Sequence, residues 1–166
     1  MIAGLSIENF TILHVAITLV AIASGLVVLI GMLGARSLPG WTALFLVTTI
    51  LTSVTGFMFP ISGITPAIVF GLISIVILAV ALAALYVKHL GGAWRWIYVT
   101  TALLALYLNV FVLIVQAFQK VPALQKLAPT QSEPPFQIAQ GVTLAAFLIL
   151  GTMAVRRFRP VLDRAQ

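Results

Sequence analysis

The feature that most constrains this sequence is a set of apolar runs, each long enough to cross a lipid bilayer. The run at residues 98–118 carries no charged residue, yet it holds Asn109 near its middle and Gln116 two turns later. A bilayer-spanning helix needs about 20 apolar residues. We therefore expect an all-α membrane bundle, forming a single domain over residues 1–166. Its five spanning helices are expected at residues 7–33, 41–59, 66–87, 93–118 and 136–155.

Residues that favour helix ends lie at several of these boundaries. Ser6 is a suitable N-cap for the first span, and Gly34 suits its C-terminal cap. Pro60 is expected to end the second span because proline cannot donate a backbone hydrogen bond. Thr65 is a suitable N-cap for the third span, with Pro66 at its first helical position.

The connections between the spans predict mostly up-and-down, antiparallel packing. Those at residues 34–40, 60–65 and 88–92 are short, and helices joined by short loops pack as antiparallel neighbours. The fourth connection, at residues 119–135, contains four prolines. We interpret it as an ordered extramembrane loop that contains no helix.

The charge distribution predicts the orientation in the membrane. Basic residues of short loops stay on the cytoplasmic side. One side of the predicted bundle carries seven basic residues: Arg36, Lys88, Arg95, Arg156, Arg157, Arg159 and Arg164. The other side carries Lys120 and Lys126 with Glu8 and Glu133. We therefore expect a bacterial inner-membrane protein with its N-terminus in the periplasm and a basic cytoplasmic tail at residues 156–166.

Composition excludes several classes of function. The chain has no cysteine, so disulfides, iron–sulfur clusters and cysteine zinc sites are excluded. Only 7% of the residues are charged, and the net charge of +6 comes from helix ends rather than from a basic soluble module, so nucleic acid is not an expected partner. No paired carboxylates and no HExxH, GxSxG or Walker motif occur, which argues against an enzyme.

Polar residues recur at helical spacing within the spans. Polar groups are costly in lipid, so these stripes are expected to face the interior of the bundle and to gather in its outer half. The candidate ligand-binding residues are His14, Thr18, Thr52, Thr55, Asn109, Gln116 and Gln140. His14 is the strongest candidate because it is ionisable and lies within a span, whereas amides and threonines often only connect helices.

These residues favour a non-enzymatic bundle that binds a hydrophobic or amphipathic small molecule, such as a quinone or a lipid, or a membrane partner. Pockets of that kind are mostly apolar with a few convergent polar groups. Three alternatives stay open. The first alternative is an accessory or assembly subunit of a membrane complex. The second is an electron-transfer protein that holds haem b through His14 or His89, and the third is an oligomeric channel or transporter lined by the threonines.

Two segments, residues 107–116 (YLNVFVLIVQ) and 128–135 (APTQSEPP), resemble those of small multi-pass membrane proteins of bacteria. The chain is also similar, distantly, to four-helix membrane cytochromes of the b-type. That resemblance implies haem binding, but the chain lacks the several histidines of those cytochromes.

Reporter fusions test the predicted topology. Fusions at Arg36 and Gln166 should be active with a cytoplasmic reporter, and a fusion at Gln125 with a periplasmic one, because of the basic-residue bias. A periplasmic signal at Gln166 would contradict the five-span topology.

Overall fold

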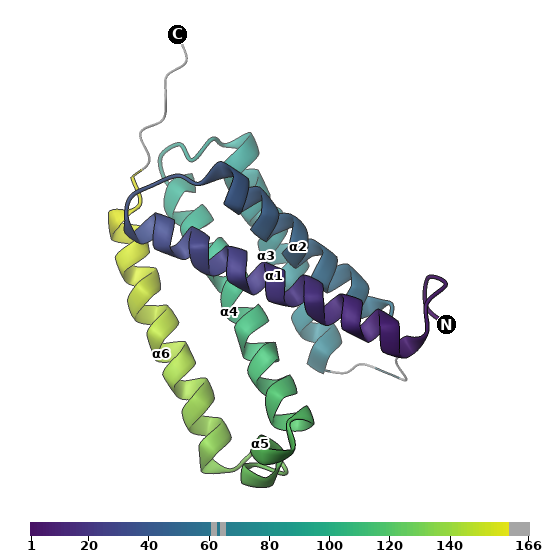
Figure 1. The fold of residues 1–166 in the computed structure, drawn as a ribbon. Helices are drawn as coiled ribbons and strands as arrows, with labels where there is room; N and C mark the ends of the chain where they lie inside the picture. The colour runs from purple at the N-terminus through teal and green to yellow at the C-terminus, as the bar shows by residue number, and fades with distance from the viewer. Residues whose placement is uncertain (61–62, 64–65, 160–166) are drawn as a thin grey trace.

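The computed structural model describes residues 1–60, 63 and 66–159, and in them the chain is a bundle of α-helices without strands (Figure 1). The helices are α1 (Ile7–Leu33), α2 (Pro39–Phe57), α3 (Pro66–Leu82), α4 (Trp94–Lys120), α5 (Pro122–Leu127) and α6 (Pro134–Arg157). A π-helical segment, η1 (Ala83–Val87), continues α3. Within the described residues, five helices are long and apolar enough to cross a membrane, namely all but α5. The predicted membrane-spanning all-α bundle is confirmed at this level.

The ends of α1 agree with the prediction. The backbone N–H of Asn9 donates to the hydroxyl of Ser6 at 3.2 Å, so Ser6 is the N-cap. Gly34 is the C-cap, but its φ is negative, and the left-handed residue after the helix is Ala35 with φ 54°. The predicted N-cap of α3, Thr65, lies outside the described residues.

Two proline-containing segments are more helical than predicted. The expectation of a helix-free connection at residues 119–135 was wrong, because Pro122 begins the short helix α5. Helix α6 likewise begins at Pro134 rather than at residue 136. The first helical positions need no N–H donor, and proline already has the φ of a helix, so these prolines begin helices rather than prevent them.

The end of α3 widens into η1 before the chain turns into α4. The N–H of Lys88 donates to the carbonyl of Ala83 at 2.9 Å, and that of Leu90 to the carbonyl of Ala84 at 3.0 Å. His89 and Leu90 then adopt left-handed backbone conformations with φ of 46° and 58°. Leu90 is buried in the core as a result of this turn.

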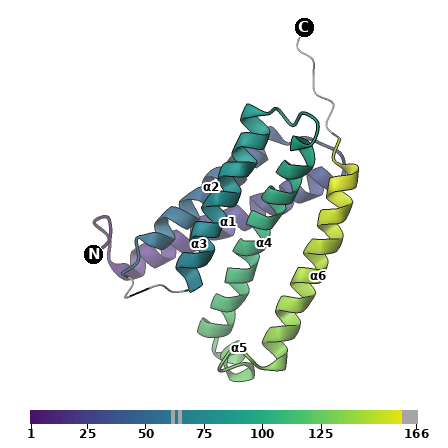
Figure 2. The same ribbon diagram turned by 180° about the vertical axis from the view of Figure 1, so that it is seen from behind.

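Helix α4 is the central helix of the bundle. It contacts α1, α3, α5 and α6, whereas α2 packs between α1 and α3 (Figure 2). Helix α6 contacts α4 and α1, and Ala154 is its one fully buried residue. The α4–α5–α6 arm diverges from α1 and α2 toward its far end (Figures 1 and 2).

The two ends of the bundle differ in chemistry. We call "basic end" the end where α1 meets α2, η1 meets α4 and α6 finishes. Its described basic residues are Arg36, Lys88, Arg95, Arg156, Arg157 and Arg159. The apolar core lies in the half toward this end, built on large side chains such as Met32, Phe45, Leu78 and Tyr98. The opposite end, called "far end" below, holds the start of α1, the end of α2 and α5.

A guanidinium group connects α4 to α6 at the basic end. Nη1 of Arg95 donates to the carbonyl of Val155 at 2.8 Å and to that of Phe158 at 2.6 Å. The last carbonyls of a helix have no partner within the helix, so this arginine satisfies groups that would otherwise be exposed to lipid headgroups. It fixes the C-terminal end of α6, where Ala154 and Phe158 are buried in the core.

Close packing of α1 is tested by Gly25→Ala. A Cβ at Gly25 would lie 2.6 Å from Cδ1 of Leu106 and 2.9 Å from the ring of Phe45, so these two side chains or α1 itself must shift. We expect a loss of about 1–3 kcal/mol in the free energy of unfolding, measured by denaturant titration in detergent micelles.

The matched control is Gly141→Ala on α6, where no atom lies within 4 Å of an added Cβ. Alanine also has the higher helix propensity, so this variant should be neutral or slightly more stable. Equal destabilisation by both variants would contradict the packing described at Gly25.

Candidate functional site

The strongest candidate site is a small cavity in the middle of the bundle, toward the far end. Its volume is about 110 Å³, and four helices enclose it. The cavity is lined by His14 and Thr18 of α1, Thr52, Ser53, Gly56 and Phe57 of α2, Phe70, Gly71 and Ser74 of α3, and Leu108, Asn109 and Val112 of α4. The predicted polar stripes of α1, α2 and α4 therefore meet around one space.

The imidazole of His14 is held by a threonine. Nδ1 of His14 lies 2.7 Å from Oγ1 of Thr55. The Thr55 hydroxyl has one proton, which it donates to the carbonyl of Leu51 at 2.7 Å. Its oxygen can therefore only accept from His14, so Nδ1 carries the proton and Nε2 of the neutral ring keeps a free lone pair.

The packing around His14 orients the ring. Phe59 stands edge-on to the imidazole, with ring centroids 5.4 Å apart. Across the helix interface a Cβ placed on Gly56 would lie 3.7 Å from Cε1 of His14, so α1 and α2 pack closely at this point. In the described residues Nε2 makes no hydrogen bond, and it is the part of the ring left to interact with a ligand.

The other hydroxyls of the cluster also use their protons on their own helices. Thr18 donates to the carbonyl of His14 at 2.8 Å, and Thr52 donates to the carbonyl of Thr48 at 2.9 Å. The two threonine oxygens are 3.3 Å apart across the α1–α2 interface. Back-bonding of this kind is common for threonine in helices and leaves each oxygen as an acceptor.

Asn109 connects α4 to α2 at the inner side of the cavity. Its Nδ2 donates to Oγ1 of Thr49 at 3.2 Å, and both side chains are buried. Thr49 is one position away from the stripe that contains Thr48 and Thr52, and the sequence analysis did not select it. A threonine beside a predicted stripe is too common in membrane helices to be found by its type alone.

Two of the predicted site residues lie elsewhere. Gln116 does not line the cavity, and Gln140 donates from Nε2 to the carbonyl of Phe111 at 3.2 Å, within the α4–α6 pair. These two amides therefore lie outside the His14 cavity. For Gln140 the reason is the divergence of α6 from α1 and α2 toward the far end (Figure 1).

The two histidines of this chain cannot ligate one haem together. In membrane cytochromes, haem b is held by two axial ligands from facing helices. His14 lies on α1 toward the far end, with Nδ1 bonded to Thr55, whereas His89 lies in the exposed turn between η1 and α4 at the basic end. The two imidazoles cannot reach one iron.

Comparisons with known proteins add no identification. No family model, curated protein or solved structure matches this chain. Any function must therefore be argued from the residues of the site.

Two substitutions compare an amide that is hydrogen-bonded between helices, Asn109, with one that lies outside the cavity, Gln116. Asn109→Leu removes the bond to Thr49 and should lower the free energy of unfolding by about 0.6–2 kcal/mol, the usual range for interhelical hydrogen bonds. Gln116→Leu should change that energy by less than about 0.5 kcal/mol. Denaturant unfolding in micelles measures both, and the opposite order would contradict the Asn109–Thr49 contact.

Proposed function

We propose that this chain is an integral membrane protein that binds a hydrophobic or amphipathic small molecule in the cavity beside His14. The ligand class is a lipid-soluble molecule with a hydroxyl donor on a small head, such as a quinol or a hydroxylated lipid. The protein acts as a binding component and not as a hydrolase or transferase, in keeping with the lack of nucleophile motifs.

The observation that carries this proposal is the one-sided hydrogen bonding of the cavity wall. The hydroxyl protons of Thr18 and Thr52 in the wall, and of Thr55 behind His14, are used by backbone carbonyls, and the proton of His14 is used by Thr55. The α1 and α2 side of the wall therefore offers oxygen and nitrogen lone pairs, whereas Ser74 of α3 and Asn109 of α4 keep protons to donate. A ligand that donates O–H gains hydrogen bonds from His14, Thr18 and Thr52, whereas one that only accepts gains none from these three side chains.

The size and remaining lining of the cavity support a small head with an apolar body. A cavity of about 150 Å³ in another protein accommodates one benzene molecule, so about 110 Å³ is on the scale of a small ring or headgroup. Phe57, Phe70 and Leu108 provide the apolar part of the wall. Ligand sites of membrane bundles commonly combine an apolar wall with a few polar groups.

The proposed location is the bacterial inner membrane, with the basic end in the cytoplasm. The support is the concentration of arginine and lysine at that end, since such residues stay cytoplasmic. The His14 cavity then lies in the periplasmic half of the bilayer and receives its ligand from that half.

The test is His14→Asn with a short-chain benzoquinol as the probe. The amide of asparagine keeps a donor near the position of Nδ1, and so preserves the bond to Thr55, but it has no counterpart of Nε2. The variant should fold, and its affinity for the quinol should fall about three- to tenfold, as for the loss of one hydrogen bond. Isothermal titration in micelles measures the affinity.

The matched control is His89→Asn, because His89 is exposed at the basic end. It should bind the quinol as the wild type does. The corresponding benzoquinone, which lacks the hydroxyl donor, should bind more weakly than the quinol. Equal affinity of wild type and His14→Asn, or a preference for the quinone, would refute the proposed role of the cavity.

A further inference from the structure

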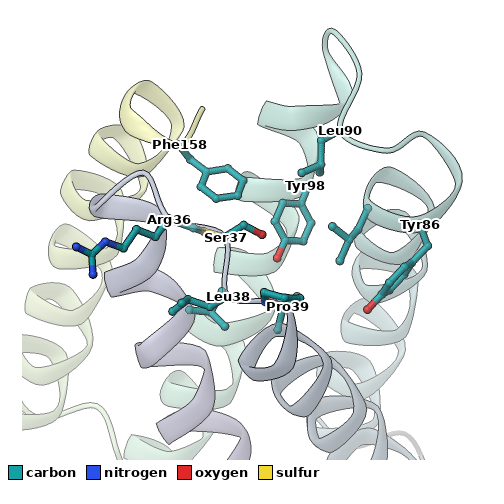
Figure 3. A pocket seen from close by; sticks show the side chains of 12 residues that line it. Arg36, Ser37, Leu38, Pro39, Tyr86, Leu90, Tyr98 and Phe158 are labelled. Carbon is teal, nitrogen blue, oxygen red and sulfur yellow. The ribbon is translucent and has the colours of Figure 1, made fainter. Parts of the chain in front are cut away.

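A second cavity lies at the basic end, separate from the His14 site. Its volume is about 200 Å³, and it is enclosed by the end of α1, the start of α2, η1 and the first turns of α4 (Figure 3). Arg36, Ser37, Pro39 and Tyr86 are exposed and form its mouth. Its interior is mostly apolar, with aromatic cover from Phe158.

Two buried hydroxyls face this cavity from different helices. Tyr98 of α4 is 2% exposed and Thr42 of α2 is 7% exposed. The ring of Tyr98 directs its hydroxyl toward the start of α2 at Pro39 (Figure 3). The two hydroxyls lie close enough for a hydrogen bond with each other, and such a pair uses only one of their two protons.

Thr42 differs in its hydrogen bonding from the later threonines of α2. Thr48, Thr52 and Thr55 all donate to backbone carbonyls, whereas Thr42 makes no such bond to a described residue. The paired hydroxyls of Thr42 and Tyr98 therefore keep one proton that can be donated to a molecule in the cavity. An occupant with a carbonyl oxygen would accept that proton.

The charge around the mouth favours an anion. Arg36 extends outward from the rim beside Ser37 (Figure 3), and Lys88 and Arg95 lie on the neighbouring turns. The acidic residues of the described chain are Glu8, in the first turn of α1, and Glu133, just before α6. Both lie toward the far end. An anionic group at the rim therefore meets positive charge, with no nearby carboxylate among the described residues.

The order of these groups follows the order of groups in a phospholipid. A phosphate lies outermost in a leaflet, ester carbonyls lie deeper and acyl chains lie deepest. Here a guanidinium and a hydroxyl stand at the rim, two hydroxyl donors lie inside, and apolar side chains of Val28 and Leu85 complete the wall. We propose that this cavity binds an anionic phospholipid, with its phosphate at Arg36 and Ser37 and an ester carbonyl at Tyr98 and Thr42.

The test measures lipid binding to the full chain in nonionic detergent. Phosphatidylglycerol, phosphatidylcholine and inorganic phosphate are titrated separately, and the thermal unfolding midpoint gives the affinity of each variant relative to its own unliganded state. Phosphatidylglycerol should raise the midpoint saturably. Arg36→Gln should weaken that affinity about tenfold, and Tyr98→Phe about threefold, because the first removes a charged hydrogen bond and the second a neutral one.

Matched variants on the same elements complete the experiment. Tyr107→Phe removes a hydroxyl from the same helix, and Arg157→Gln removes an exposed charge at the same end, and neither residue lines this cavity. Both should bind phosphatidylglycerol as the wild type does. An equal shift with phosphatidylcholine, saturation by inorganic phosphate alone, or an equal loss in Arg157→Gln would each overturn the proposal.

Discussion

The structure depends on the close approach of α1 to α2 and α4 at Gly25. No side chain fits there, because the space is taken by Phe45 and Leu106. Apolar surface gives little driving force between helices in lipid, so contact distance and packing have to supply the association. Ala21 and Gly25 are buried on one face of α1, and their small size lets α2 and α4 come close. As a result, polar side chains of the three helices can form hydrogen bonds one to three turns away, toward the far end. The site at His14 is thus a consequence of packing by small residues elsewhere on the same face.

The cavities at His14 and at Tyr98 differ in the hydrogen bonds of their threonines. At His14 the threonines have given their protons to the backbone and present lone pairs. At Tyr98 the hydroxyl of Thr42 is instead a neighbour of the phenol and makes no bond to its own helix among the described residues. The difference between Thr42 and Thr52 is not one of residue type or of a missing carbonyl, since the carbonyl of Leu38 accepts the Thr42 N–H at 2.9 Å. It comes from the neighbouring helix, which places the Tyr98 hydroxyl beside Thr42.

The sequence alone predicted the long helices and some of the residues that line the His14 cavity. Hydrophobic run length and caps predicted α1 almost to the residue, and helical spacing predicted that His14, Thr18, Thr52 and Asn109 share one interior. Spacing shows which face of a helix is polar, but it does not show which neighbour that face meets. Gln140 has the expected depth, but it lies on a helix that diverges and bonds to α4 rather than lining the His14 cavity. The partner Thr49, the π-helical widening at η1 and the cavity at Tyr98 depend on tertiary packing that no local pattern records.

The back-bonded threonines also limit how protons can move through this bundle. A proton relay requires each hydroxyl to receive one proton and release another, with its O–H free to reorient between the two. The hydroxyls of Thr18, Thr52 and Thr55 are each tied to a carbonyl of the preceding turn, so reorientation would break a bond inside a dry helix interface. A proton accepted at Nε2 of His14 consequently has no onward route along this row of side chains.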